Sequence, residues 1–119
     1  EILMNREAIA IDRDPLGIQG FPFKKEGDLH TWLKPLSEGR WAVCFLNRGR
    51  QDISLSIDWK QFTVKDELSG QQLDTKEHVY SVRDIWAKED LGTTGKKDFT
   101  TLLPGHDVFC IVLTPVNAL

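Results

Sequence analysis

The sequence RWAVCFLN, residues 40–47, is an almost unbroken apolar run of the length of a β-strand. Side chains alternate between the two faces of a sheet, so an apolar run of this kind predicts a strand that is covered on both faces. The sequence DVFCIVLT, residues 107–114, has the same character and ends at Pro115. The two runs therefore predict strands at the centre of a hydrophobic core.

Shorter strands are predicted around this pair. The sequence DISLSID, residues 52–58, alternates apolar and serine residues, which predicts a half-buried strand. The other expected elements are strands at 29–36, 78–87 and 99–103, a helical turn at 59–62, a hairpin of 63–66 with 71–74, and a polar loop over 88–97. Several short strands separated by turn signals predict an all-β fold, an antiparallel β-sandwich of Greek-key type.

The N-terminal sequence NREAIAIDRDPLGIQG, residues 5–20, predicts a short helical segment ahead of the sandwich. Asn5 is a suitable N-cap, and Asp14-Pro15 ends the helix because a proline disfavours helical backbone in the residue before it. A helix of about two turns is marginal in isolation and needs a surface to pack on. We therefore expect a helix and turn in residues 1–20 and the sandwich in residues 21–119.

Composition narrows the range of partners. The chain of 119 residues is 40% apolar and 28% charged, with a net charge of −3, which describes one soluble globular domain. The slight negative charge argues against nucleic acid and against an anionic membrane as the main partner. No segment is long and apolar enough to predict a membrane span.

The two cysteines, Cys44 and Cys110, each lie in one of the apolar runs. They are too few for a closed zinc site, and their surroundings favour buried thiols that act as small apolar side chains. A disulfide between them remains the alternative. On the chain-entropy model it would stabilise the fold by about 4 kcal/mol.

The sequence carries no pattern of a catalytic or metal site. None of the three histidines, His30, His78 and His106, belongs to an HExxH pair, and neither a GxSxG motif nor a glycine-rich phosphate loop is present. No two acidic residues stand out as an acid and base pair. We therefore expect no catalytic residue, no metal site and no cofactor in this chain.

The four tryptophans are the remaining candidates for ligand binding. A flat ring suits the apolar face of a sugar, but large aromatic residues also fill the cores of sandwiches. Trp41 begins a core strand and Trp86 follows alternating apolar residues, so both are assigned to the core or to a domain interface. Trp32 and Trp59 are the candidates for an exposed pair that binds sugar.

Four segments, in the same order along the chain, carry a family resemblance: ILMNREAIAIDRDPLGIQG, RWAVCFLNRG, SVRDIW and PGHDVFCIVLTP. They resemble the end of the catalytic barrel, the first long sandwich strand, the V-R-D-L-W motif and the closing strand of glycoside hydrolase family 27. This is the melibiase-like family of α-galactosidases and α-N-acetylgalactosaminidases. The chain departs from the family pattern at Arg13, where glutamine is usual, and at Asp107, where glycine is usual.

The resemblance implies a parent enzyme with a (β/α)8 barrel followed by a β-sandwich. The two catalytic aspartates of such a retaining glycoside hydrolase lie in the barrel, outside this chain. This chain is then a non-catalytic accessory domain that stabilises the barrel and shapes substrate access. The expected barrel interface contains Ile9, Ile11, Asp14, Pro15, Leu16 and Ile18.

The resemblance also implies an extracellular, periplasmic or lysosomal-type compartment. Two other functions stay open at this point. One is a carbohydrate-binding module that holds galactosides on its exposed tryptophans. The other is a domain that self-associates through the apolar residues of its N-terminal segment.

Overall fold

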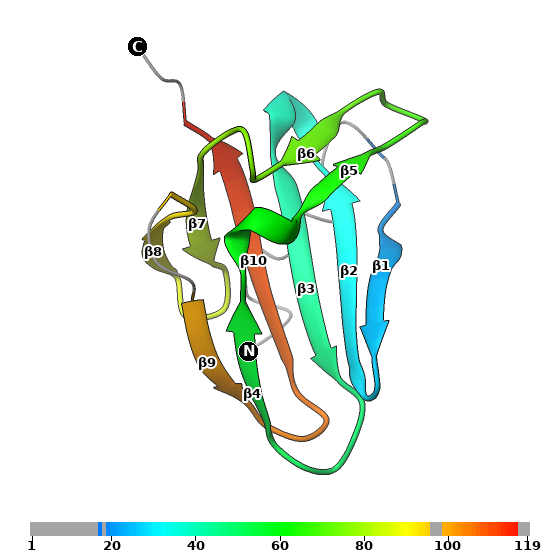
Figure 1. Cartoon of the computed structure of the whole chain (residues 1–119), viewed down its shortest axis with the longest axis vertical. Coiled ribbons are helices and arrows are strands. Elements are labelled where there is room, and N and C mark those ends of the chain that lie inside the picture. The colour runs from blue at the N-terminus through cyan, green and yellow to red at the C-terminus, as the bar shows by residue number, and fades with distance from the viewer. Residues whose placement is uncertain (1–16, 18, 96–98, 117–119) are drawn as a thin grey trace.

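The computed structural model describes residues 17, 19–95 and 99–116 and shows a two-layer antiparallel β-sandwich (Figure 1). The first layer is a six-stranded sheet in the order β1-β2-β3-β10-β7-β8. Its strands are β1 (Phe21–Glu26), β2 (Leu29–Pro35), β3 (Trp41–Asn47), β7 (Tyr80–Asp84), β8 (Glu89–Thr93) and β10 (Val108–Pro115). These pairings confirm the predicted all-β fold.

The second layer lies in front of this sheet in Figure 1 and consists of two short strand pairs. Strand β4 (Ile53–Ile57) pairs with β9 (Phe99–Leu103), and β5 (Thr63–Lys65) pairs with β6 (Gln72–Asp74). The 3-10 turn η3 (Trp59–Gln61) joins the two pairs, and a second turn, η2 (Ser37–Gly39), follows β2. The predicted helical turn and the predicted hairpin are both confirmed. Among the described residues, no helix is long and apolar enough to cross a membrane.

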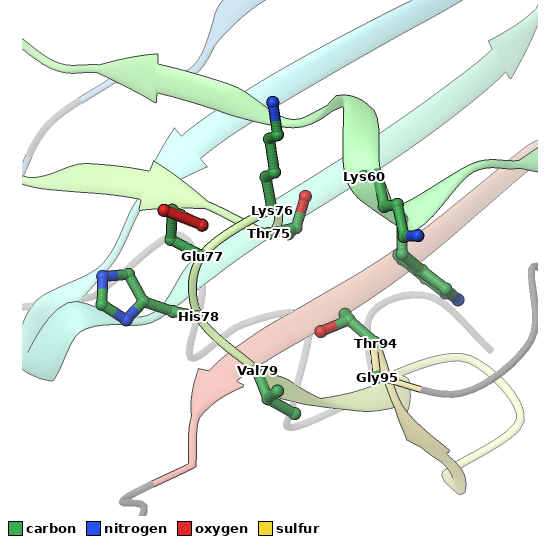
Figure 2. A pocket seen from close by; sticks show the side chains of 9 residues that line it. Lys60, Thr75, Lys76, Glu77, His78, Val79, Thr94 and Gly95 are labelled. Carbon is green, nitrogen blue, oxygen red and sulfur yellow. The ribbon is translucent and has the colours of Figure 1, made fainter.

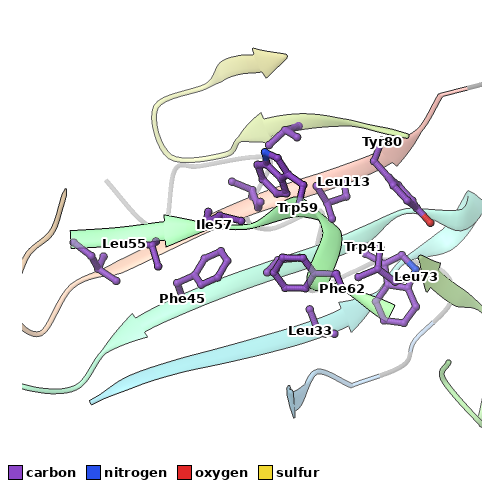
Figure 3. Packing of buried hydrophobic residues seen from close by; sticks show 14 residues of the cluster. Leu33, Trp41, Phe45, Leu55, Ile57, Trp59, Phe62, Leu73, Tyr80 and Leu113 are labelled. Carbon is purple, nitrogen blue, oxygen red and sulfur yellow. The ribbon is translucent and has the colours of Figure 1, made fainter. Parts of the chain in front are cut away.

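The core fills the space between the two layers (Figure 3). The six-stranded sheet contributes side chains from alternate positions, among them Trp41, Val43 and Ile111, each 0% exposed. The second layer contributes Leu55, Ile57, Trp59, Phe62, Leu73 and Leu103. Because the whole of this cluster comes from the sandwich strands and their turns, the domain has a hydrophobic core of its own.

The two apolar runs form neighbouring strands at the centre of the larger sheet, as predicted. Strand β10 lies between β3 and β7, with Ile111 opposite Val43. Burial on both faces, however, is only partly observed. Among the side chains that point away from the second layer, Ala42 and Cys110 are buried, at 2% and 6% exposure, whereas Leu46 is half-buried and Val108 is 38% exposed. We call this side of the six-stranded sheet the outer face.

The two edge strands of this sheet were not predicted. Phe21 and Phe23 of strand β1 pack against the core, as does Leu91 of strand β8. Most of the other residues in the two strands are charged or small. An edge strand pairs on one side only and tolerates exposed charges, so its sequence carries a weak apolar signal. The predicted polar loop at 88–97 is therefore wrong over Glu89–Thr93.

The predicted strand over 78–87 is shorter in the structure because of a local cap. Strand β7 ends at Asp84, whose Oδ1 atom accepts hydrogen bonds from the backbone N–H groups of Trp86 and Ala87, each at 3.0 Å. Lys88 then takes a φ of 57°, which completes the reversal of the chain into β8.

Cys44 and Cys110 form a disulfide, so the expectation of two free thiols is wrong. The two residues face each other directly across β3 and β10, with their Cα atoms 4.2 Å apart. Both side chains lie on the outer face, since the inward positions of these strands belong to the core cluster. Whether the two cysteines form a disulfide depends on the register between β3 and β10. The composition of the two apolar runs does not determine that register.

The hairpin between β5 and β6 is organised by Asp66. The Asp66 carboxylate Oδ2 accepts a hydrogen bond of 2.8 Å from the backbone N–H of Ser69, and its backbone accepts one of 2.7 Å from Gly70. Hydrogen bonding from Ser69 holds the pKa of Asp66 below its ordinary value and outweighs the opposing effect of burial. The turn closes at Gly70, where φ is 75°, a conformation that glycine adopts without strain.

Asn47 ties the two layers together where their turns meet. Its amide Nδ2 donates hydrogen bonds to the backbone oxygens of Gln51, at 2.7 Å, and Leu103, at 3.1 Å. Its Oδ1 accepts a hydrogen bond of 3.0 Å from the backbone of Gly49. The residue is 2% exposed, so one buried amide links β3, the turn after it and the end of β9.

Candidate functional site

The two tryptophans predicted to form a sugar-binding pair lie in different layers of the sandwich. Trp32 is on β2, projects from the outer face and is 38% exposed. Trp59 begins η3 in the second layer and packs into the core, where it is only 3% exposed. The exposure predicted for Trp32 is confirmed and that for Trp59 is wrong, so the two rings do not form one platform.

A small cleft lies beside η3 and the β6–β7 turn (Figure 2). Its volume is about 150 Å³, and it is lined by Trp59, Lys60, Thr75, Lys76, Glu77, His78, Val79, Thr94 and Gly95. Figure 2 shows the charged side chains pointing in different directions instead of converging on one point. The cleft therefore offers no concentrated charge to hold a ligand.

The two threonines in this cleft serve the fold. Thr75 Oγ1 accepts a hydrogen bond of 3.2 Å from the backbone of Phe62, and Thr94 Oγ1 accepts one of 3.0 Å from the backbone of Tyr80. Both threonines are buried at 6% exposure. Their hydroxyls satisfy buried backbone donors between neighbouring loops, which accounts for two polar residues at these positions.

A wider, open groove lies at the opposite end of β3 and β10. It has a volume of about 410 Å³ and is lined by Leu46, Asn47, Arg48, His106, Asp107 and Val108. A hydrogen bond of 3.0 Å from the His106 backbone N–H to the Gly49 oxygen holds the two turns side by side. Sequence reasoning missed this groove because its walls come from two turns that only the strand pairing brings together.

The close approach of these two turns also explains a glycine. A Cβ atom at Gly105 would collide with the backbone carbonyl of Arg50. The next residue, His106, takes a left-handed φ of 60°. The Pro-Gly-His-Asp turn, residues 104–107, is thus shaped by its contact with the chain after β3.

Arg83 and Asp84, the charged pair of the SVRDIW motif, act separately. Arg83 Nη1 contacts Asp90 Oδ1 on the neighbouring strand β8 at 3.1 Å. The Asp90 side chain is 83% exposed, and an ion pair this open to water adds little stability. Asp84 instead caps the turn that follows its own strand.

No group of three or more metal-ligating side chains occurs within the described part of the chain. The predicted barrel-interface residues lie outside the described residues: Ile9, Ile11, Asp14, Pro15, Leu16 and Ile18. The predicted N-terminal helix lies outside them as well.

Comparison with known proteins decides the family. Residues 26–113 match the family described as the alpha galactosidase C-terminal beta sandwich domain. The chain belongs to this family. The matched region begins at the end of β1 and ends within β10, so it covers nearly all of the sandwich.

The relatives are α-galactosidases and related glycosidases. The chain is 37% identical over 114 residues to alpha-galactosidase A of Cellvibrio japonicus, a match that covers 96% of this chain and 28% of the relative. The crystal structure of alpha-galactosidase I from Mortierella vinacea matches with a TM-score of 0.73 at 20% identity, over 98% of this chain and 29% of that one.

A GH27 β-L-arabinopyranosidase from Geobacillus stearothermophilus matches with a TM-score of 0.66 at 23% identity, over 98% of this chain and 24% of that one. The same sandwich thus accompanies enzymes named for different sugars. The chain spans 28% of the length of the Cellvibrio relative and a similar share of these structures. It corresponds to their C-terminal domain.

Proposed function

We propose that this chain is the non-catalytic accessory domain of an α-galactosidase-like retaining glycoside hydrolase. In this role it stabilises the catalytic barrel that precedes it and helps to shape access to the substrate. The observation that carries the proposal is the match of residues 26–113 to a C-terminal domain, in a chain that spans 28% of an α-galactosidase. The separate hydrophobic core of the sandwich supports a structural role.

Two measurements test this function. The 119-residue chain, incubated with nitrophenyl α-galactoside, is expected to release no nitrophenol above background. In the longer enzyme, deletion of residues 21–119 is expected to lower the temperature at which half of the galactosidase activity is lost. A deletion variant that is as heat-stable and as active as the intact enzyme would remove the basis for the accessory role.

A second candidate function rests on the exposed ring of Trp32. Its 38% exposure, on the same side of the sheet as Leu46 and Val108 of the open groove, leaves a ring face available to a sugar. Titration of the chain with galactose or melibiose, followed by tryptophan fluorescence, tests this alternative. A Trp32→Ala variant is the matched control, because a true signal should vanish in it.

A further inference from the structure

Strand β4 leaves one of its two edges unpaired. It pairs with β9 from Ile53 to Ile57 in an unbroken antiparallel register, and β9 is its only strand partner among the described residues. In a strand, the N–H and C=O groups of alternate residues point to opposite sides. Part of the β4 backbone therefore points away from β9, and no hydrogen bond to another described segment engages it. An edge of this kind is a template for pairing with a further strand.

The edges of the six-stranded sheet are protected against such pairing, whereas the β4 edge is not. Strand β1 carries Pro22, a bulge, and the neighbouring charges of Lys24 and Lys25. Strand β8 carries Glu89 and Asp90 and has an irregular register with β7. Proline, charge and bulges are the features by which natural sheets discourage a further strand. The β4 sequence, ISLSI, has none of them; β9 is also uncharged, so the β4 edge is distinguished by what lies beside it.

A small apolar cleft lies beside this free edge. In Figure 1, β9 lies on one side of β4, and β1 and β2 of the sheet behind lie on the other. The cleft is on the second side, because its lining comes from β1, β2, β3, β4 and the η3 turn, with none from β9. Its apolar walls are Phe23, Leu29, Phe45, Leu55 and Phe62. Phe23 and Leu29 are only half-buried, so the cleft opens to the surface.

The size and position of the cleft suit the side chain of an added strand. Its volume of about 20 Å³ is too small for a small-molecule ligand but admits the end of one apolar side chain. Neighbouring strands lie about 4.8 Å apart, and residues opposite each other share a face. A strand on the free edge of β4 would therefore direct alternate side chains inward, level with Ile53, Leu55 and Ile57. Its other side chains would face water beside the two serines of β4.

Negative charges at both ends of β4 favour a particular partner. Asp52 and Asp58 flank the strand, and both are exposed. Asp52 Oδ1 accepts a hydrogen bond of 3.2 Å from the backbone of Gly105, and Asp58 Oδ1 accepts one of 3.0 Å from the backbone of Lys60, so both carboxylates are held in place. A second copy of β4, paired antiparallel about Leu55, would place Asp52 opposite Asp58 at each end. Like charges opposite each other destabilise a strand pair, whereas opposite charges stabilise it.

From these observations we propose that the free edge of β4 binds an extended peptide segment of another protein, with apolar residues at alternate positions and a basic residue at each end. Asp52 and Asp58 are six positions apart, so the two basic residues should be separated by about 20 Å of extended chain. Backbone hydrogen bonds hold the added strand, and the cleft receives its central apolar side chain. Lys24, in the wall of the cleft, lies 3.7 Å from Glu26, so this pair leaves the negative charge of the two aspartates uncompensated.

Hydrogen–deuterium exchange of the 119-residue chain tests the proposal. The probe is the peptide KITVTIK with both ends blocked, and the control peptide EITVTIE differs only in the charge of its two end residues. The first peptide should slow amide exchange in residues 53–57, and the second should bind at least about fivefold more weakly. No protection of residues 53–57, protection of β1 or β8 instead, or equal affinity for the two peptides would overturn the proposal. Protection of residues 53–57 on concentrating the chain alone would also overturn it, since β4 would then pair with a second copy.

Two variants separate the charges beside β4 from those at another edge. Asp52→Asn combined with Asp58→Asn removes both flanking charges but keeps the oxygen atoms that accept the two backbone hydrogen bonds. Its affinity for KITVTIK should fall about five- to tenfold. The control, Glu89→Gln combined with Asp90→Asn, removes the same charge from the β8 edge and should change the affinity by less than about twofold at 0.15 M salt, where distant charges are screened. An equal loss in the two variants would show that the peptide responds only to net charge and would refute binding at β4.

Discussion

The buried amide of Asn47 should be indispensable to the contact between the two turns. The substitution Asn47→Asp keeps the shape of the side chain but replaces the Nδ2 donor by an oxygen. This oxygen would face the carbonyl oxygens of Gln51 and Leu103, now 2.7 Å and 3.1 Å from Nδ2. Each buried acceptor that loses its donor costs about 1–3 kcal/mol, so we expect a loss of about 3–5 kcal/mol at pH 7.

The pH dependence of this loss gives a sharper test than its size. Burial among carbonyl oxygens should raise the pKa of the new carboxyl above that of an aspartate in the unfolded chain. The penalty is then complete above the raised pKa and diminishes as the pH falls, because a protonated carboxyl donates one hydrogen bond again. The difference in stability between the variant and the native chain should therefore narrow from pH 7 toward pH 4.

Urea unfolding followed by tryptophan fluorescence measures both quantities. The control is Gln51→Glu, the same change from amide to carboxylate at an exposed position four residues away, which should alter stability by less than about 0.5 kcal/mol. A loss below about 1 kcal/mol for Asn47→Asp, or a loss that grows as the pH falls, would refute the role given to this amide.

Three further predictions concern other parts of the domain. Asp66→Asn should lower the free energy of unfolding by about 1–2 kcal/mol near neutral pH. Since the pKa of Asp66 is lowered in the fold, this difference should disappear as the pH falls below about 4. An undiminished difference at pH 3 would contradict the role given to the Asp66 carboxylate. Replacing both Cys44 and Cys110 by alanine should lower the free energy of unfolding by about 4 kcal/mol. Thiol titration of the unsubstituted chain under denaturing conditions should find no free thiol. Two free thiols would exclude the disulfide. Trp59→Ala should lower the free energy of unfolding by about 3–5 kcal/mol because it opens a cavity in the core. Trp32→Ala in the isolated chain should lower it by less than about 1 kcal/mol. Similar losses of stability for the two variants would contradict the different burial of the two tryptophans.

The sequence by itself determined the fold class and the centre of the core. The apolar runs at 40–47 and 107–114 gave the two central strands, and the Ile53, Leu55 and Ile57 alternation gave the face of β4 that packs inward. These signals are local, since an alternating or unbroken apolar pattern can be read from one strand alone. The family resemblance was readable for a similar reason, because short motifs keep their residues in order along the chain.

Only the tertiary structure decided how the two central strands are used. Their sequences do not show how far each face is covered: on the outer face Cys110 is buried, whereas Val108, two residues before it, is 38% exposed. The burial of Trp59, the exposure of Trp32 and the direct opposition of Cys44 and Cys110 likewise depend on register and on the packing of distant strands. Each of these features belongs to a pair of segments far apart in the chain, and the physical reason is that burial and pairing are properties of contacts, which a single strand's sequence does not contain.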